Sequence, residues 1–269
     1  MVILSYLSEL STSLGKCLSK MIKKINAKQL KYVVPSLFTV LAMMAAFYSI
    51  LQAASGFFSH AAYGVIIAMI FDSLDGRTAR FTNTCTAFGA SLDSITDMMA
   101  YGVAPAIMMY CWGLFRLGKI GYLVCFIFCA CAGLRLARFN VMLGVADKRF
   151  FQGLSSTIAG GFIVTFLLTC VQHGIYSLGT IYFAAGLTTL TALLMVSNVK
   201  FYSFKESGGS PKIIVLVLII ILLLLMVLTY KYKGLVAFGV LMVYILVNLI
   251  LQPFYKDKLA DHSSSMLAN

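Results

Sequence analysis

Long apolar runs alternate with short polar segments through most of the sequence, and this pattern predicts transmembrane helices. Each run is close to the roughly 20 apolar residues that a helix needs to cross a bilayer. The runs lack the two-residue alternation of apolar and polar positions that is typical of the strands of a membrane β-barrel. Eight spans are predicted, at residues 33–53, 61–81, 88–112, 119–141, 155–172, 177–198, 212–230 and 234–252.

The order of these spans predicts an all-α integral membrane protein in five parts. Residues 1–32 form a cytoplasmic segment, 33–198 a six-span core, 199–211 a cytoplasmic loop, 212–252 two additional spans and 253–269 a cytoplasmic tail. The two additional spans are rich in Leu, Ile and Val and carry no charge in their interior. Dimerisation and simple anchoring are both open as their role.

The first 32 residues combine a basic face with an apolar stripe. Such a segment is expected to lie as an amphipathic helix on an anionic membrane surface, although a disordered basic tail is the alternative. It lacks the compact apolar core and the small-residue cleavage site of a signal peptide. The basic residues are Lys16, Lys20, Lys23, Lys24, Lys28 and Lys31.

Composition excludes an ordinary soluble protein, because 61% of the residues are hydrophobic and only 11% are charged. The positive-inside rule then sets the orientation. With the N-terminus in the cytoplasm, 17 of the 21 Lys and Arg residues fall on the inner side, and four, Arg116, Lys119, Lys231 and Lys233, fall outside. Both termini are therefore expected in the cytoplasm, at the cell (inner) membrane. The net charge of +12 is explained by anionic lipid without a nucleic-acid partner.

The chain has seven Cys and three His, and their positions do not suggest a metal site or a disulfide framework. Cys129 and Cys131 are too close together for the usual pairing of structural zinc ligands. His60 and His173 lie in predicted loops and His262 lies in the predicted tail, so they do not form a cluster.

Acidic residues are concentrated where a membrane protein tolerates them least. Four of the seven Asp lie between residues 72 and 97, at the predicted cytoplasmic ends of the second and third spans. Asp72 and Asp75 share one helix face, and Asp93 and Asp97 share another. Four carboxylates would repel one another, so a divalent cation is expected between them. Oxygen ligands without Cys or His favour Mg²⁺ or Mn²⁺.

The residues between these acids predict a phosphate-bearing substrate. Gly76 and Gly89 leave the backbone open to close approach by a ligand. Arg80 carries a planar guanidinium that can pair with a phosphate. Carboxylates, arginine and open backbone at the cytoplasmic interface together favour phosphoryl transfer on a nucleotide-bearing substrate.

The stretch Asp-x₂-Asp-Gly-x₂-Ala-Arg-x₈-Gly-x₃-Asp-x₃-Asp, running from Asp72 to Asp97, resembles the signature of the CDP-alcohol phosphotransferase family at every fixed position. The resemblance implies that Asp72, Asp75 and Asp93 hold two divalent cations against a diphosphate. It implies that Asp97 is the general base and can also touch a metal. Gly76, Ala79, Arg80 and Gly89 would contact the CDP-linked lipid. It also implies a six-span core, which residues 33–198 can supply.

Three further stretches resemble the phosphatidylserine synthase branch of this family. They are Tyr101-Gly-Val-Ala-Pro-Ala106 with the preceding Ser94-Ile-Thr-Asp97, Arg135-Leu-Ala-Arg-Phe-Asn140, and the segment from Leu194 to Lys205. The resemblance implies CDP-diacylglycerol and L-serine as substrates, and we also expect a homodimer. The sequence departs from the branch or the wider family at Ser36, Ala100, Tyr101 and Ser155.

Arg135 and Arg138, near the cytoplasmic end of the fourth span, are candidates for holding the serine carboxylate. Snorkelling to the lipid headgroups is the alternative for each. Arg135 is the first choice because it lies deeper, by roughly 4.5 Å of helix rise.

The reaction expected from these features is direct attack of the serine hydroxyl on the lipid-side phosphorus of CDP-diacylglycerol. Double displacement through a covalent enzyme intermediate remains open. Glycerol 3-phosphate, inositol or choline are the alternative acceptors. A cation transporter is the alternative from another class, because buried acids also line ion pathways.

Overall fold

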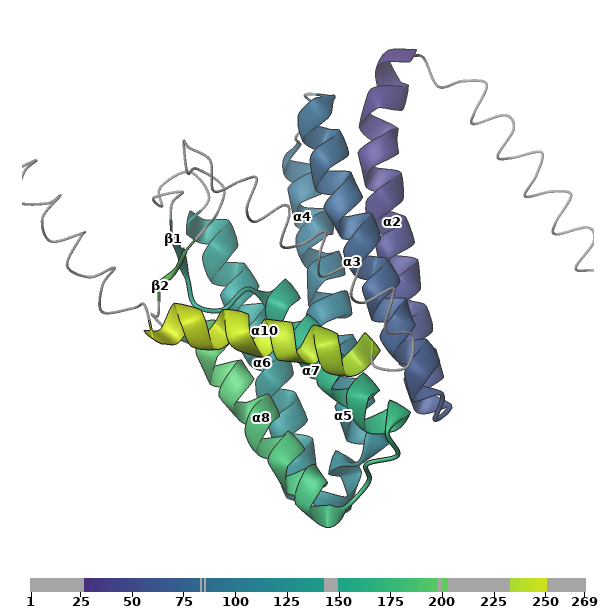
Figure 1. Ribbon diagram of the computed structural model, residues 1–269. Helices are drawn as coiled ribbons and strands as arrows, with labels where there is room; N and C mark the ends of the chain where they lie inside the picture. Colours follow the sequence, from purple (N-terminus) through teal and green to yellow (C-terminus); the bar gives the residue numbers. More distant parts are fainter. Residues whose placement is uncertain are drawn as a thin grey trace, which may run out of the picture.

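A computed structural model describes residues 27–82, 84, 86–142, 150–197, 200–202 and 233–250. The described chain is almost entirely helical (Figure 1). Its elements are α2 (Ala27–Ala54), α3 (Phe58–Phe81), α4 (Ala87–Asp97), the π-helix η1 (Met98–Val103), α5 (Ala104–Trp112), the 3₁₀-helix η2 (Leu114–Leu117), α6 (Lys119–Met142), β1 (Phe150–Gln152), α7 (Ser156–Gln172), α8 (Leu178–Val196), β2 (Lys200–Tyr202) and α10 (Lys233–Ile250).

The helical architecture is that of a membrane protein. Among the described residues, three helices are long and apolar enough to cross a bilayer, at Val34–Ala54, Lys119–Val141 and Leu178–Val196. The other predicted spans within the described residues also coincide with helices, but whether each crosses the membrane stays a prediction. The predicted span 212–230, the N-terminal segment up to residue 26 and the C-terminal tail lie outside the described residues.

Three details differ from the sequence prediction. First, α2 already includes residues 27–32, which the sequence analysis assigned to the surface segment. Second, the third predicted span changes from α-helix to π-helix over Met98–Val103 before it continues as α5. Third, β1 and β2 pair as a two-stranded antiparallel sheet, and β2 falls inside the predicted loop 199–211. Their Phe and Tyr residues have high β-propensity, which explains the local extended backbone.

Helices α2 and α3 lie side by side and approach each other closely (Figure 1). The Ser49 hydroxyl donates a hydrogen bond of 2.8 Å to the carbonyl oxygen of Ala61. A Cβ atom at Gly64 would lie 2.9 Å from the Cβ of Ser49, so only glycine fits without displacement. Small residues at a helix interface permit this kind of close packing between membrane helices. The contact fixes the position of α3, which carries two of the four clustered aspartates.

The polypeptide turns back after α3. The side chain of Thr86 accepts a hydrogen bond of 3.0 Å from the backbone N–H of Gly89 and caps the start of α4. This short connection returns the chain alongside α3, and the acid-bearing faces of α3 and α4 meet.

Helix α7 occupies the interior of the bundle, and most of its residues are buried. Helix α10 lies across it in Figure 1, and the rings of Phe162 and Phe238 stack with their centroids 4.9 Å apart. The backbone N–H of Gly234 also donates to the side-chain oxygen of Gln172, at 3.2 Å. One of the two predicted additional spans therefore packs on the core instead of standing apart from it.

Candidate active site

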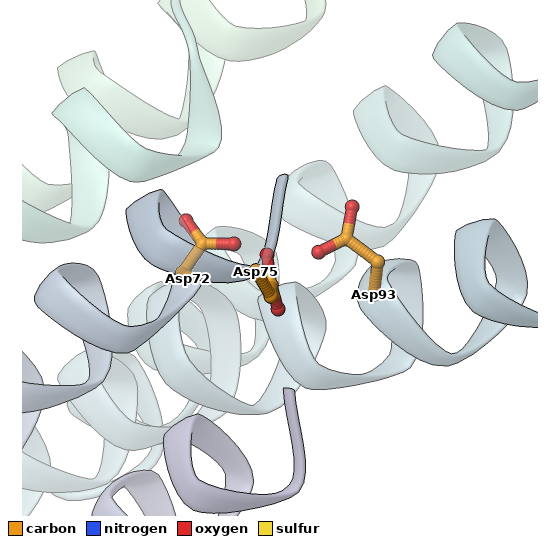
Figure 2. A group of neighbouring side chains, drawn as sticks. All are labelled: Asp72, Asp75 and Asp93. Atoms are coloured by element: carbon orange, nitrogen blue, oxygen red, sulfur yellow. The ribbon is translucent and has the colours of Figure 1, made fainter. Parts of the chain in front are cut away.

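Three carboxylates converge between α3 and α4 (Figure 2). One oxygen from each of Asp72, Asp75 and Asp93 lies within 4.8 Å of the others. Asp75 is buried with 5% of its surface exposed, and the other two are half-buried. The three-residue spacing of Asp72 and Asp75 turns both toward α4, where Asp93 faces them.

Asp97 is the last residue of α4 and lies beside these three carboxylates. It is half-buried and interacts electrostatically with Asp72 and Asp93, and with Arg135 of α6. It does not belong to the group whose oxygens all lie within 4.8 Å of one another. Its four-residue spacing from Asp93 places it one helical turn further along α4.

The carboxylates fit a divalent cation. Buried oxygens Oδ2 of Asp75 and Oδ1 of Asp97 have no hydrogen-bond partner among the described residues. An unpaired buried carboxylate oxygen is costly, and a cation is the partner that would satisfy several at once. The three converging donors are all oxygens, as Mg²⁺ and Mn²⁺ prefer.

Tyr101 was not among the residues predicted for the site, but the structure places its hydroxyl there. The hydroxyl donates a hydrogen bond of 2.9 Å to Oδ2 of Asp72. The one sequence signal was that Tyr stands here where the phosphatidylserine synthase branch usually has Phe. The difference between the two residues is the hydroxyl that makes this contact.

The π-helix η1 lies directly after Asp97 and contains Tyr101. Short π-helical segments are often found at functional sites, because they change the direction of side chains within a continuous helix. Gly102 permits tight packing here, since a Cβ atom would lie 3.1 Å from Ala132 and from the sulfur of Met98. The segment therefore sets the position of Tyr101 relative to α3 and α6.

The residues expected to contact a CDP-linked lipid lie on both sides of the α3–α4 turn. Arg80 is exposed, and its Nε donates a hydrogen bond of 2.9 Å to the carbonyl oxygen of Gly76. A Cβ atom at Gly76 would meet only a guanidinium nitrogen of Arg80, at 4.0 Å, so packing among the described residues does not require glycine there. A Cβ at Gly89 would lie 3.2 Å from the capping hydroxyl of Thr86, so the helix cap also favours glycine. Ala79 is half-buried near the end of α3.

The two candidate arginines have different surroundings. Arg135 donates a hydrogen bond of 2.8 Å to the hydroxyl of Ser156, the first residue of α7, and interacts electrostatically with Asp97. Its guanidinium carbon lies 5.7 Å from the centre of the Phe139 ring. Arg138 donates a hydrogen bond of 3.3 Å to the carbonyl oxygen of Val196, at the end of α8. A basic side chain at this position stabilises the C-terminus of a helix.

A second contact that the sequence analysis did not identify joins α4 to α6. The side-chain amide of Asn140 donates a hydrogen bond of 3.0 Å to the hydroxyl of Ser94, the residue after Asp93. Both residues belong to stretches in which the sequence resembles the phosphatidylserine synthase branch. The structure thus brings two of these stretches together at the end of the site.

Comparison with protein families identifies a match over most of the described core. Residues 32–189, more than half of the chain, match the model of the CDP-alcohol phosphatidyltransferase family. The matched region runs from α2 into α8 and contains all four clustered aspartates.

Individual proteins with sequences similar to this chain are named as enzymes that make serine-containing lipids. A CDP-diacylglycerol–serine O-phosphatidyltransferase of Helicobacter pylori is 34% identical over 185 residues, which cover 69% of this chain and 78% of the relative. An enzyme of the same name from Methanocaldococcus jannaschii is 38% identical over 137 residues, or 51% of this chain and 61% of the relative. An archaetidylserine synthase of Methanothermobacter thermautotrophicus is 35% identical over 179 residues, or 65% of this chain and 72% of the relative.

Proposed function

The chain belongs to the CDP-alcohol phosphatidyltransferase family, and on this premise we propose that it transfers the phosphatidyl group of CDP-diacylglycerol to the hydroxyl of L-serine. The products would be phosphatidylserine and CMP. The observation that carries the proposal is the position of Arg135, which interacts with Asp97 beside the three converging carboxylates. The names of the relatives, which include serine transferases from bacteria and archaea, support the acceptor.

Asp72, Asp75 and Asp93 would hold two divalent cations, Mg²⁺ or Mn²⁺, with Asp97 as a possible further ligand. When bound, such cations neutralise the charge of a diphosphate and polarise its phosphorus–oxygen bonds. The exposed guanidinium of Arg80 would pair with a phosphate of CDP-diacylglycerol. Gly76, Ala79 and Gly89 would let the nucleotide approach the backbone, and the open space above Gly76 supports this role.

Asp97 would act as the general base. Its electrostatic interactions with Asp72, Asp93 and Arg135 support a place for Asp97 at the boundary of the proposed diphosphate and acceptor sites. It would accept the proton of the serine hydroxyl as the oxygen bonds to the lipid-side phosphorus. The bond from that phosphorus to the bridging oxygen breaks in the same displacement, and CMP leaves with that oxygen.

Arg135 would pair with the carboxylate of the incoming serine. Its hydrogen bond to Ser156 uses one of the five N–H donors of the guanidinium, so further donors would serve a ligand. Holding the carboxylate at a fixed point orients the serine hydroxyl toward Asp97, which accounts for part of the rate enhancement. Arg138 is the second candidate, but its hydrogen bond to the end of α8 favours Arg135.

The membrane arrangement is part of the proposal. We expect eight spans in the cell membrane, both termini and the active site on the cytoplasmic side, and a homodimer. The count of Lys and Arg on the two sides supports this orientation. CDP-diacylglycerol would then enter the site from the inner leaflet.

Purified enzyme offered CDP-diacylglycerol with one acceptor at a time tests the function. We expect CMP release with L-serine, and little with glycerol 3-phosphate, inositol, choline or ethanolamine. Ethanolamine is the sharpest comparison, because it has the amine and hydroxyl of serine but no carboxylate. Equal rates with serine and ethanolamine would contradict the role of Arg135. Activity with only one of the other acceptors would identify that acceptor, and not serine, as the substrate. No CMP release with any acceptor would contradict the transferase reaction.

A further inference from the structure

We infer that Tyr101 is a positioning residue that fixes the carboxylate of Asp72 in the orientation needed to bind a divalent cation. The inference rests on the proposed function, in which Asp72 is a metal ligand. It goes beyond that function because the aspartate signature does not include Tyr101. The resemblance to the phosphatidylserine synthase branch would suggest Phe at position 101, and Phe has no hydroxyl to donate a hydrogen bond to Asp72.

The hydrogen bond joins two elements that are distant in sequence. Tyr101 lies in η1 and Asp72 in α3, and the hydroxyl-to-Oδ2 distance is 2.9 Å. The donor has no freedom to turn to water, because Tyr101 is fully buried. A phenol has one hydrogen to donate, so donation to Asp72 fixes the direction of that hydrogen.

The surrounding backbone holds the tyrosine ring in place. A Cβ atom at Gly160 of α7 would lie 2.9 Å from the carbonyl oxygen of Tyr101 and 3.0 Å from its Cα and Cβ. Helix α7 therefore packs directly against the Tyr101 backbone. The π-helix η1 begins directly after Asp97 and also restricts the backbone that carries Tyr101. A donor held this rigidly imposes its own position on the carboxylate.

The contact leaves Asp72 available to a cation. A carboxylate has about four lone-pair positions, and the tyrosine hydroxyl uses one of them, on Oδ2. One oxygen of Asp72 lies within 4.8 Å of an oxygen of Asp75 and of Asp93, so the carboxylate can share a cation with them. Hydrogen bonds to metal ligands from neighbouring side chains commonly set ligand orientation, and their removal lowers metal affinity or activity by about 10- to 100-fold.

A merely structural hydrogen bond would give a different result from a positioning one. If the hydroxyl only satisfied a half-buried carboxylate, its loss would lower stability without changing affinity for metal. If it orients the ligand, its loss would weaken metal binding, and a sufficient concentration of metal would restore turnover.

The decisive experiment compares Tyr101→Phe with the matched control Tyr110→Phe in full-length protein in detergent. Tyr110 lies in α5 and is partly exposed. Mn²⁺ binding is measured directly by electron paramagnetic resonance, and turnover is measured over a range of Mn²⁺ concentrations. We expect Tyr101→Phe to raise the Mn²⁺ Kd by about 10- to 100-fold and to recover turnover at high Mn²⁺. Tyr110→Phe should match the wild type.

Direct measurement of Mn²⁺ binding tests the metal site separately from the positioning role of Tyr101. A wild-type protein that binds no Mn²⁺ would contradict the metal site itself. A wild-type protein that binds Mn²⁺, together with a Kd for Tyr101→Phe within twofold of it, would contradict the role of Tyr101. A loss of turnover that high Mn²⁺ does not restore would also contradict that role.

A second measurement covers the case in which Tyr101→Phe does not fold. Incorporation of 3-fluorotyrosine at position 101 keeps the hydroxyl, and its ¹⁹F resonance reports on the hydrogen bond during titration with Mg²⁺. We expect the resonance to shift with the midpoint of metal binding. A resonance that stays constant while Mg²⁺ binds would contradict the inference.

Discussion

Arg135 of α6 and Ser156 of α7 are joined by a hydrogen bond of 2.8 Å beside Asp97. Ser156 is completely buried at the start of its helix, so its hydroxyl is a fixed point for the guanidinium. The guanidinium also packs over the ring of Phe139. This arrangement argues against snorkelling, because a snorkelling side chain extends toward the headgroups and not toward the first residue of a neighbouring helix.

Ser156→Ala should weaken serine binding without affecting CDP-diacylglycerol. Loss of a hydrogen bond to a charged group costs about 1.5 kcal/mol or more, which corresponds to roughly a tenfold increase in the KM for serine. The KM for CDP-diacylglycerol should stay within twofold. Steady-state kinetics with each substrate varied in turn check this, and the partly exposed Ser197, at the end of α8, provides the control Ser197→Ala. An unchanged KM for serine would show that Ser156 does not orient Arg135 for the acceptor.

Arg135→Ala should have a larger effect of the same kind. An unpaired serine carboxylate in this site costs about 2–5 kcal/mol, or about 30- to several thousand-fold in the KM for serine. Arg116→Ala is the matched control, because Arg116 also packs over an aromatic ring, that of Tyr176, but lies at the opposite end of the bundle. If both KM values rise equally, Arg135 belongs to the phosphate site. If neither changes, Arg138 becomes the candidate for the carboxylate.

Asp97→Asn should abolish most turnover while leaving CDP-diacylglycerol binding within a few-fold. The substituted amide cannot accept the proton of the serine hydroxyl, and general base catalysis contributes about 100- to 10,000-fold. The rate of CMP release at saturating substrates and the Kd for CDP-diacylglycerol are the two measurements. A variant with a tenth of the normal rate would contradict the role of Asp97 as base.

Removal of divalent cations should abolish activity, and Asp72→Asn or Asp93→Asn should raise the concentration of Mg²⁺ or Mn²⁺ needed to restore it. Both residues belong to the trio whose oxygens lie within 4.8 Å of one another. The KM for CDP-diacylglycerol should rise together with the metal requirement. Asp257→Asn, in the predicted C-terminal tail, is a control that removes an acid elsewhere. Full wild-type activity in excess EDTA would contradict a metal-dependent reaction.

The sequence predicted the apolar helices of the described residues and the acid cluster, because both depend on local spacing. The length of an apolar run determines where a helix such as α6 begins and ends, to within a few residues. The three- and four-residue spacings of the aspartates determine which of them share a face. Because a short turn joins α3 to α4, the acid-bearing faces of the two helices come together.

Contacts between distant segments were not predictable in this way. The hydrogen bond from Tyr101 to Asp72 depends on the π-helix, which has no simple signature in the sequence, and on the packing of α7 against η1. The pairing of β1 with β2 joins segments that lie on either side of α7 and α8. In each case tertiary packing determines which distant residue or strand makes the contact, so neither residue type nor spacing identifies it.

Gly76→Ala should stabilise the protein and yet impair it. Among the described residues, a Cβ atom at Gly76 meets only a guanidinium nitrogen of Arg80, at 4.0 Å, so the helix should gain up to about 1 kcal/mol in stability. The same methyl group would occupy the space through which the nucleotide approaches α3, and the KM for CDP-diacylglycerol should rise at least tenfold. Gly186→Ala in α8 is the matched control, because a Cβ there meets no atom of the described residues within 4 Å and the site is distant. The midpoint temperature of thermal unfolding should rise in both variants, while only Gly76→Ala should lose affinity for CDP-diacylglycerol. If Gly76→Ala keeps the wild-type KM, the glycine does not serve nucleotide binding.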